Sequence, residues 1–166
     1  DNESSTSHEN FYWNDRAKNY KLDVRDYENT KDLYKEVDYV FHMAADPSIQ
    51  NAVENPINAI SINSMGTITA LQCSKEAGVK RFICASSCSV YGFTDNQVLN
   101  ELDTTKPSYP YGISKLQCEV GINTLEDNTF KPILFRKGTV GGYSERMRYD
   151  LVVNTMLKNA LTIGKI

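Results

Sequence analysis

The chain has 166 residues, a formal net charge of −3 and 40% hydrophobic residues, which is enough for one globular domain with a real core. The mild acidity gives no reason to expect nucleic acid or an anionic membrane as a partner, no apolar run approaches the roughly 20 residues of a membrane span, and residues 1–20 lack the apolar centre of a signal peptide. The four cysteines form no CxxC pair and only two histidines accompany them, so we expect reduced core thiols in a cytoplasmic protein and no metal site.

The first part of the chain is predicted to hold a polar loop, two strands and a short helix. Residues 1–18 are rich in Asn, Ser, Asp and Glu, which is typical of a loop. A short strand is predicted over 19–24, and Asp26 is a suitable N-cap for a helix over about 28–36. Residues 38–45 are almost continuously apolar, so we expect a parallel strand that is buried on both faces and ends in small residues.

A long helix is predicted next. Residues 48–54 suit a short helical turn, and Pro56 suits the first turn of a helix that runs to about Ala77, where Gly78 ends it. Asn63 lies in the middle of this helix, which is a poor place for an amide unless it has a partner. The apolar stripe of the helix is predicted to consist of Ile57, Ile60, Ile68, Ala70 and Leu71.

The second half of the chain alternates strands and helices. The stretch 81–92 begins as an apolar strand and stops abruptly in hydroxyl-bearing residues, and a loop over 93–108 leads to a helix over about 109–126. A strand over 131–136 and an amphipathic helix over 149–160 follow. This alternation predicts the α/β class, with a Rossmann-type doubly wound parallel sheet that has helices on both faces. Ligands bind such sheets beyond the carboxyl ends of the strands.

Tyr111 and Lys115 are four residues apart in the helix predicted over 109–126, so their side chains lie on one face. A free Tyr has a pKa of about 10, but a cation within about 4–6 Å favours the phenolate. Tyr111 could then take a proton from a sugar hydroxyl while hydride leaves the adjacent carbon for NAD⁺, with Ser87 bonded to the same oxygen. Each residue also has an ordinary explanation, because Tyr-x-x-x-Lys arises by chance and Ser at a strand end is usually a turn former. The combination at strand ends favours a dinucleotide site.

The order of these motifs is similar to that of a known family. The chain resembles the extended short-chain dehydrogenase/reductases, and within them the NAD-dependent sugar-nucleotide epimerase/dehydratase family. The motifs that carry the resemblance are Asp23-Val24 before Arg25-Asp26, VFHMAA over 40–45, Asn63 with Gly66-Thr67, Ser86-Ser87 through Val90-Tyr91-Gly92, Pro110-Tyr111 through Ser114-Lys115, and Arg136 before Gly138-Thr139-Val140-Gly141. The resemblance implies that Tyr111 is the catalytic acid/base, that Lys115 is its electrostatic helper and a ribose ligand, and that Ser87 is the third catalytic residue.

The resemblance also implies an NAD site. Its residues are Asp1, Asn2, Asp23, Val24, Met43, Ala44, Ala45, Asn63, Ala85, Ser86, Tyr111 and Lys115. Asp1-Asn2 resembles the end of the family's second strand, where the acidic residue binds the adenosine ribose and repels a 2′-phosphate, which favours NAD over NADP. The GxxGxxG fingerprint is absent from the sequence. We therefore expect an amino-terminally truncated piece that lacks the first strand, glycine loop and helix and most of the substrate domain, and that alone binds NAD poorly and turns over little.

The substrate side follows from the same resemblance. Residues 1–142 are predicted to form the NAD-binding domain and 143–166 the start of the sugar-nucleotide region. The implied substrate-binding residues are Ser87, Cys88, Ser89, Thr139, Arg148 and Asn154. Family dehydratases carry Asp-Glu directly after the serine, whereas this chain has Cys88 and Ser89, so a UDP-hexose 4-epimerase is favoured. A nucleotide-sugar reductase, a dehydratase or a truncated non-catalytic Rossmann module remain alternatives.

Family members usually dimerise through the long helix and the Tyr-bearing helix, so the resemblance implies a homodimer for the full-length protein. Apolar residues on these two predicted helices could form the contact, or they could pack on the sheet. They are Ile60, Leu71, Leu116 and Ile122.

Overall fold

The computed structural model describes residues 1–4, 11–95, 98–145 and 147–166. The chain divides into two compact units, one formed by Asp1–Asn2 and Tyr20–Arg136 and the other by Glu3–Asn19 and Lys137–Ile166, and each is described by itself. The elements are α1 (Tyr27–Thr30), the 3₁₀-helix η2 (Lys31–Tyr34), β1 (Tyr39–His42), α2 (Ile49–Glu54), α3 (Pro56–Ile60), the π-helical turn η3 (Ser61–Met65), α4 (Gly66–Glu76), β2 (Arg81–Ser87), the 3₁₀-helix η4 (Cys88–Tyr91), α5 (Pro110–Leu125), β3 (Ile133–Lys137) and α6 (Val152–Ile163).

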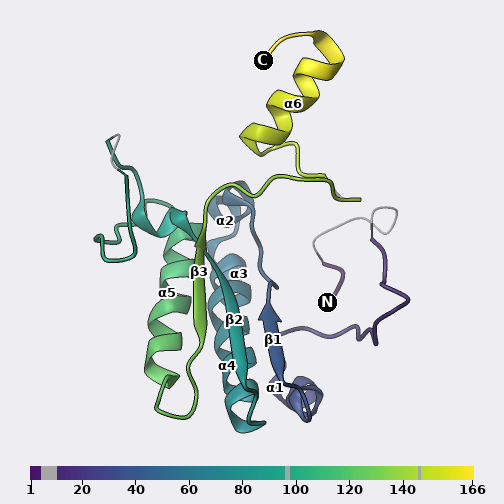
Figure 1. Cartoon of the computed structure of the whole chain (residues 1–166), viewed down its shortest axis with the longest axis vertical. Helices are drawn as coiled ribbons and strands as arrows, with labels where there is room; N and C mark the ends of the chain where they lie inside the picture. The colour runs from purple at the N-terminus through teal and green to yellow at the C-terminus, as the bar shows by residue number, and fades with distance from the viewer. Residues whose placement is uncertain (5–10, 96–97, 146) are drawn as a thin grey trace. The chain divides into compact units, whose positions relative to one another are not determined.

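The strands of the described residues form one sheet in the order β1-β2-β3 (Figure 1). β1 and β2 run parallel, with Tyr39 opposite Arg81 and His42 opposite Cys84. α4 lies between β1 and β2 in sequence, and α5 lies between β2 and β3, as expected for crossover helices. The predicted parallel sheet with flanking helices is therefore confirmed, whereas the predicted helices on both faces are not, because the described helices cover one face of the sheet.

The core lies between one face of this sheet and helices α4 and α5. Its buried residues are Ala70, Leu71, Phe82, Cys84, Ile122 and Phe130, with Tyr34, Val40, Leu125 and Leu134 packed against them. Side chains alternate between the two faces of a strand, so Tyr39, Phe41, Ile133 and Phe135 lie on the opposite face. Tyr39 is 61% exposed and Phe41 is 68% exposed. The prediction that the 38–45 strand is buried on both faces is wrong, because the described helices cover only one face.

The long helix predicted from Pro56 forms, but its geometry changes in the middle. α3, η3 and α4 run on without a break, and Gly78 with φ +73° follows the helix end. Ile57, which was predicted to belong to the apolar stripe, is 82% exposed, whereas Leu71 is fully buried. The π-helical turn explains the difference, because its wider turn breaks the 3.6-residue repeat on which the predicted stripe depends.

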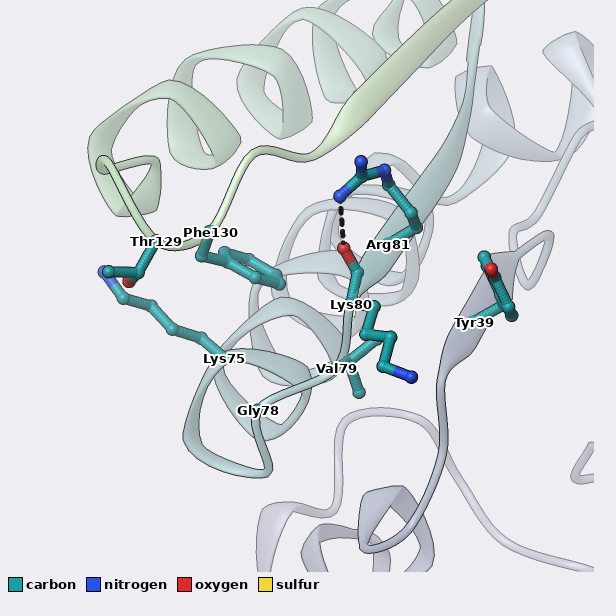
Figure 2. A pocket seen from close by; sticks show the side chains of 8 residues that line it. All are labelled: Tyr39, Lys75, Gly78, Val79, Lys80, Arg81, Thr129 and Phe130. Carbon is teal, nitrogen blue, oxygen red and sulfur yellow. Dashed lines mark hydrogen bonds between the residues drawn. The ribbon is translucent and has the colours of Figure 1, made fainter.

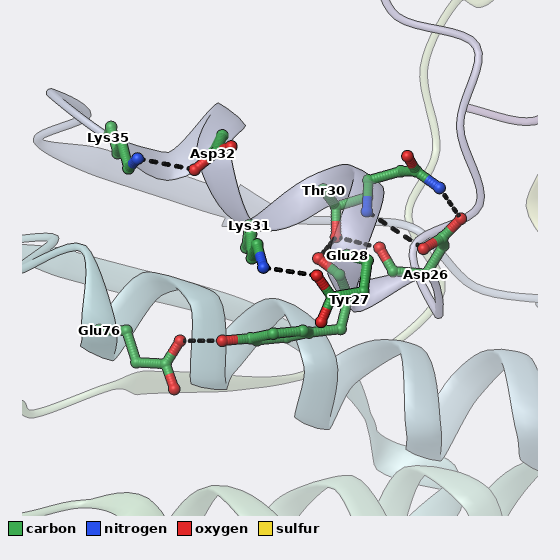
Figure 3. Close-up of polar contacts among 9 residues, drawn as sticks. Asp26, Tyr27, Glu28, Thr30, Lys31, Asp32, Lys35 and Glu76 are labelled. Atoms are coloured by element: carbon green, nitrogen blue, oxygen red, sulfur yellow. Dashed lines mark hydrogen bonds and ion pairs between the residues drawn. The ribbon is translucent and has the colours of Figure 1, made fainter.

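The segment before β1 is less regular than predicted. Figure 3 shows that Asp26 caps α1, since its carboxylate accepts a hydrogen bond from the backbone N–H of Asn29 (3.1 Å). The hydroxyl of Tyr27 donates to Glu76 Oε2 (2.6 Å) and so fixes α1 to the end of α4 (Figure 3). The single helix predicted over 28–36 is instead α1 followed by η2, which ends at Tyr34.

The strand predicted over 19–24 does not form. The described residues show short backbone pairing there: Leu22 N–H donates to Asp1 O (2.9 Å), and the amino group of Asp1 donates to Tyr20 O (3.3 Å). A regular strand needs a longer run of such pairs along a neighbouring strand.

The remaining elements lie close to their predicted positions. α2 and α5 begin and end within one residue of prediction, whereas β3 and α6 begin two and three residues later than predicted. In α6, which belongs to the second unit, Leu157 is 59% exposed and Leu161 is 78% exposed. Within the described part of the chain, no helix combines the length and apolar character that crossing a membrane requires.

Candidate active site

The carboxyl end of β2 presents the predicted catalytic serine. Ser87 ends the strand in extended conformation (φ −150°, ψ 146°) and caps η4, because its Oγ accepts a hydrogen bond from the Ser89 N–H (3.1 Å). The hydroxyls of Ser87 and Ser89 are also 3.1 Å apart. Ser87 is half-buried, and its hydroxyl contacts the backbone and side chain of Ser89.

The start of α5 places the predicted Tyr/Lys pair beside this strand end. Lys115 is 5% exposed, and its Nζ donates to the carbonyl oxygen of Ala85 (2.9 Å), two residues before Ser87. The same Nζ lies 5.9 Å from the centroid of the Tyr111 ring. A buried ammonium next to a phenol favours the ionised phenol. The structure therefore brings Tyr111 and Lys115 to the carboxyl end of the Ser87 strand.

Gly112 allows α5 to approach η4 closely. A Cβ at this position would lie 2.6 Å from the carbonyl oxygen of Ser89 and 3.1 Å from Pro107 Cβ. Because a backbone oxygen cannot move aside as a flexible side chain does, only glycine fits here without a shift of η4 or α5.

We expect Gly112→Ala to lower the free energy of unfolding by about 1–3 kcal/mol, because the new methyl group overpacks against the Ser89 carbonyl. Urea unfolding followed by circular dichroism measures the change. Gly138→Ala is the matched control, since a Cβ there meets no atom within 4 Å. Equal unfolding midpoints for the two variants would contradict the close approach.

Asn63 joins the turn after β1 to the Tyr-bearing helix. Its Oδ1 accepts from the Asp46 N–H (2.7 Å), and its Nδ2 donates to Asp46 O (3.1 Å) and to Ser114 Oγ (2.9 Å). Ser114 Oγ in turn donates to the carbonyl oxygen of Tyr111 (2.7 Å). Asn63 is fully buried and lies in η3, and π-helical turns are frequent at functional sites. The partners that a mid-helix Asn requires are therefore the backbone of Asp46 after β1 and the Ser114 hydroxyl on α5.

His42 is buried beneath the same region, at the end of β1. Thr67 Oγ1 donates its proton to Asn63 O (2.6 Å), so it can only accept from His42 Nε2, 3.0 Å away. The proton of the neutral imidazole is therefore assigned to Nε2. Burial, with a smaller contribution from the charge of Lys115, lowers the pKa of His42 to about 4.

This buried imidazole predicts a loss of stability in mild acid. The unfolded His42 binds a proton below about pH 6.5, whereas the folded one stays neutral until about pH 4, so the free energy of unfolding falls by about 3 kcal/mol across this window. Urea unfolding at several pH values should show this slope, and His42→Leu should remove most of it.

The acid limb below pH 4 is the internal control for that experiment. The Arg25 guanidinium, 2.6 Å from the Asp23 carboxylate, lowers the pKa of Asp23 to about 2. The wild type and His42→Leu should therefore lose the same amount of unfolding free energy as the pH falls from about 4 towards 2. An unchanged slope between pH 6.5 and 4 in His42→Leu would show that other groups cause it.

The residues predicted to touch the cofactor differ in their solvent exposure. Met43 is 59% exposed, Ala44 is exposed and Ala45 is half-buried, so the turn after β1 is open to a ligand. Two further predicted cofactor contacts lie together, because Asn2 Nδ2 donates a hydrogen bond to Asp23 Oδ2 (3.2 Å). Asp1 is exposed and Val24 is half-buried. By contrast, the side chains of Asn63, Ala85 and Ser86 are buried, and their contact with a cofactor stays a prediction.

The predicted substrate residues lie in both units. Cys88, in the first unit, is exposed and its thiol donates to the carbonyl oxygen of Arg136 (3.1 Å). Thr139 is exposed in the second unit, where Arg148 pairs with Asp150 (2.5 Å) and the buried Asn154 donates to Arg148 O (2.9 Å). Contact of these residues with a nucleotide sugar stays a prediction.

Three residues of the site were not predicted from the sequence. Ser114 and Asp46 are the partners of Asn63, and Glu119 is a buried carboxylate on α5 that pairs with Arg136 (2.7 Å). Glu119 follows Lys115 by four residues, so its place on the same helix face was visible in the sequence. A glutamate on a helix is usually solvated, which is why its burial could not be predicted.

A separate pocket lies at the opposite ends of the strands. It has a volume of about 490 Å³ and is lined by Tyr39, Lys75, Gly78, Val79, Lys80, Arg81, Thr129 and Phe130 (Figure 2). Lys75 is paired with Asp127 and Lys80 with Asp38, each at 2.7 Å. Since Tyr39 and Arg81 are the first residues of β1 and β2, this pocket lies away from Ser87 and the Tyr/Lys pair.

The chain is similar in sequence to known proteins. The sequence model described as NAD dependent epimerase/dehydratase family matches residues 3–165. The UDP-glucose 4-epimerase of Lacticaseibacillus casei is 30% identical over 106 residues, which are 63% of this chain and 32% of that protein. The CDP-glucose 4,6-dehydratase of Salmonella typhimurium is 29% identical over 143 residues, 80% of this chain and 38% of that protein.

The chain is also similar to solved structures. The structure of MoeE5 in complex with UDP-glucose and NAD is similar with a TM-score of 0.75 and 28% identity, covering 87% of this chain and 48% of that one. The chain thus spans from 32% to 48% of the length of these three similar proteins.

Proposed function

Because the chain belongs to the NAD dependent epimerase/dehydratase family, we propose that the whole protein is an NAD-dependent nucleotide-sugar epimerase that acts at C4 of a UDP-hexose. The observation that carries the proposal is the position of Lys115 at the Ser87 end of β2. Its Nζ donates to the Ala85 carbonyl oxygen (2.9 Å) and lies 5.9 Å from the centroid of the Tyr111 ring. A cation beside a phenol at this strand end supports proton transfer to and from a sugar hydroxyl.

The proposed roles follow from this arrangement. Tyr111 takes the proton of the sugar hydroxyl and later returns it, and the charge of Lys115 favours the phenolate that does so. Ser87 hydrogen-bonds the same sugar oxygen and orients it. NAD⁺, when bound, supplies the acceptor for the hydride and the means to return it to the other face of the sugar.

The residues at the carboxyl end of β1 fit a dinucleotide. Ala44 is exposed and carries only a methyl group, so a flat ligand can approach the backbone of this turn closely. Asp23 and Asn2, which are hydrogen-bonded to each other, are the proposed contacts of the adenosine. Asn63 holds the turn after β1 through its hydrogen bonds to the backbone of Asp46, so we assign Asn63 a positioning role in this site.

An epimerase is preferred to a dehydratase because of the residues after Ser87. Elimination of water needs an acid and a base in addition to the hydride acceptor. Cys88 and Ser89 supply neither a carboxylic acid nor a carboxylate. The similarity to the Salmonella dehydratase keeps dehydration as the second candidate, and a reductase could use the same three residues.

One assay separates these reactions. The whole protein is incubated with NAD⁺ and UDP-glucose or UDP-galactose, and the products are examined by mass spectrometry and proton NMR. Epimerisation leaves the mass unchanged and inverts the configuration at C4, which changes the proton couplings, whereas dehydration removes the mass of one water. A parallel incubation with NADH and a nucleotide keto-sugar tests reduction, which consumes NADH. Binding of NAD with no change in any nucleotide sugar would support a non-catalytic module instead.

The proposal extends to organisation and compartment. Residues 1–142 are proposed to bind NAD and residues 143–166 to begin the sugar-nucleotide region, in a cytoplasmic homodimer. Leu71 and Ile122 belong to the core and not to a dimer contact, whereas Met65 (58% exposed) and Val120 (57% exposed) are available on the same helices. Sedimentation velocity of the whole protein tests the dimer.

A further inference from the structure

α5 carries a third residue in line with Tyr111 and Lys115. Glu119 follows Lys115 by one more step of four residues, so all three lie on one helix face. Lys115 Nζ donates to Ala85 O (2.9 Å), and the Glu119 carboxylate accepts a hydrogen bond from the Ser86 hydroxyl. The two residues directly before Ser87 are thus each bonded to α5.

The charge of Glu119 is buried and compensated by one partner. Its side chain is 4% exposed, and Arg136 of β3 donates to it through Nε (3.1 Å to each oxygen) and Nη2 (2.7 Å). The hydrogen bonds that Arg136 donates to Glu119 raise the pKa of the Arg136 guanidinium above its usual value. Removal of one partner would leave an uncompensated charge, which is strongly destabilising, whereas replacement of both by apolar residues is often tolerated.

The same arginine also holds the segment that follows Ser87. Its Nη1 donates to the Tyr91 hydroxyl (2.9 Å) and to Glu101 O (3.2 Å), and its guanidinium lies 5.0 Å from the Tyr91 ring centroid. The Tyr91 hydroxyl donates onward to Asn100 O (2.9 Å). The Glu119–Arg136 pair therefore contacts the chain on both sides of Ser87, at Ser86 before it and at Tyr91 after it.

We propose that Glu119 and Arg136 form a positioning unit that fixes the orientation of the Ser87 hydroxyl relative to Tyr111. The proposal rests on the proposed function for its catalytic consequence, but its structural part can be tested without turnover. The Ser87 Oγ accepts the Ser89 N–H, so hydrogen exchange of the Ser89 amide reports whether the Ser87 side chain keeps its orientation.

The decisive variant is the double substitution Glu119→Leu/Arg136→Met, measured in the whole protein. We expect its urea midpoint to recover most of the loss seen in Glu119→Leu alone, because no buried charge is left unpaired. We also expect the Ser89 amide to exchange about tenfold faster than in the wild type, and kcat to fall by about 10- to 100-fold with little change in KM. A purely structural role predicts that kcat and Ser89 exchange recover together with the midpoint, and that result would overturn the proposal.

Two further variants keep the test valid if the double variant does not fold. Ser86→Ala removes only the bond to Glu119, and it should also accelerate Ser89 exchange. Lys75→Met breaks an ion pair with Asp127 at the other end of the sheet (2.7 Å), and it should leave Ser89 exchange and kcat unchanged. If Ser89 exchange were unchanged in Ser86→Ala, the positioning unit would be wrong. If the wild-type protein were inactive on every nucleotide sugar, only the proposed function would be contradicted.

Discussion

We expect Tyr111→Phe to lower kcat for interconversion of UDP-hexoses by about 100- to 10,000-fold in the whole protein, the range that a lost general acid/base gives. The substitution removes only the hydroxyl, so the ring can stay beside Lys115, whose Nζ lies 5.9 Å from its centroid. KM for the nucleotide sugar should therefore change far less than kcat. Steady-state kinetics with NMR detection of the C4 epimer measures both.

Tyr109→Phe is the matched control for this experiment. Tyr109 precedes α5, is 45% exposed and makes an edge contact with Phe93 (5.7 Å between ring centroids). Tyr109→Phe also removes a phenolic hydroxyl, but one that lies two residues from Tyr111 and outside the proposed site. The variant should therefore keep the wild-type kcat. If both variants retained full activity, Tyr111 would not be the acid/base and the proposed mechanism would be wrong.

The local signals in the sequence were sufficient for the elements that carry the Tyr/Lys pair and the serine. β2 was predicted because an apolar run stops in Ser86 and Ser87, and α5 because Pro110 suits a first helical position. The helix that follows a parallel strand begins near the carboxyl end of that strand, so the position of Lys115 near the Ser87 end of β2 followed from topology. The contact distances themselves could not be predicted, because they depend on the close approach at Gly112.

The sequence was less informative where the outcome depends on distant partners. The apolar character of Tyr39 and Phe41 predicted burial, but burial depends on which layer covers the strand, and the described helices cover the other face. The mid-helix position of Asn63 signalled a partner without identifying it, since its bonds go to residues 17 and 51 positions away. Glu119 was missed for the same reason, because Arg136 lies on a different strand.

The second large effect is expected from Asn63→Leu, which should lower the free energy of unfolding by about 2–4 kcal/mol. Leucine is similar in size but makes none of the three bonds to Asp46 and Ser114. The N–H and C=O of Asp46 are then left in a half-buried turn without their partners, and such unpaired backbone groups are costly. Urea unfolding measures the loss.

Asn58→Leu is the control within the same continuous helix, because Asn58 is exposed near its start. A surface substitution of this kind should change stability by no more than about 0.5 kcal/mol. Amide exchange adds a second reading, since loss of the Asn63 side chain should accelerate exchange of the Asp46 N–H while the core amide of Leu71 stays protected. If Asn63→Leu matched Asn58→Leu in both measurements, the bonds of Asn63 would not hold the turn after β1 against the Tyr-bearing helix. The buried amide in the π-helical turn would then be a consequence of the fold and not a support of the site.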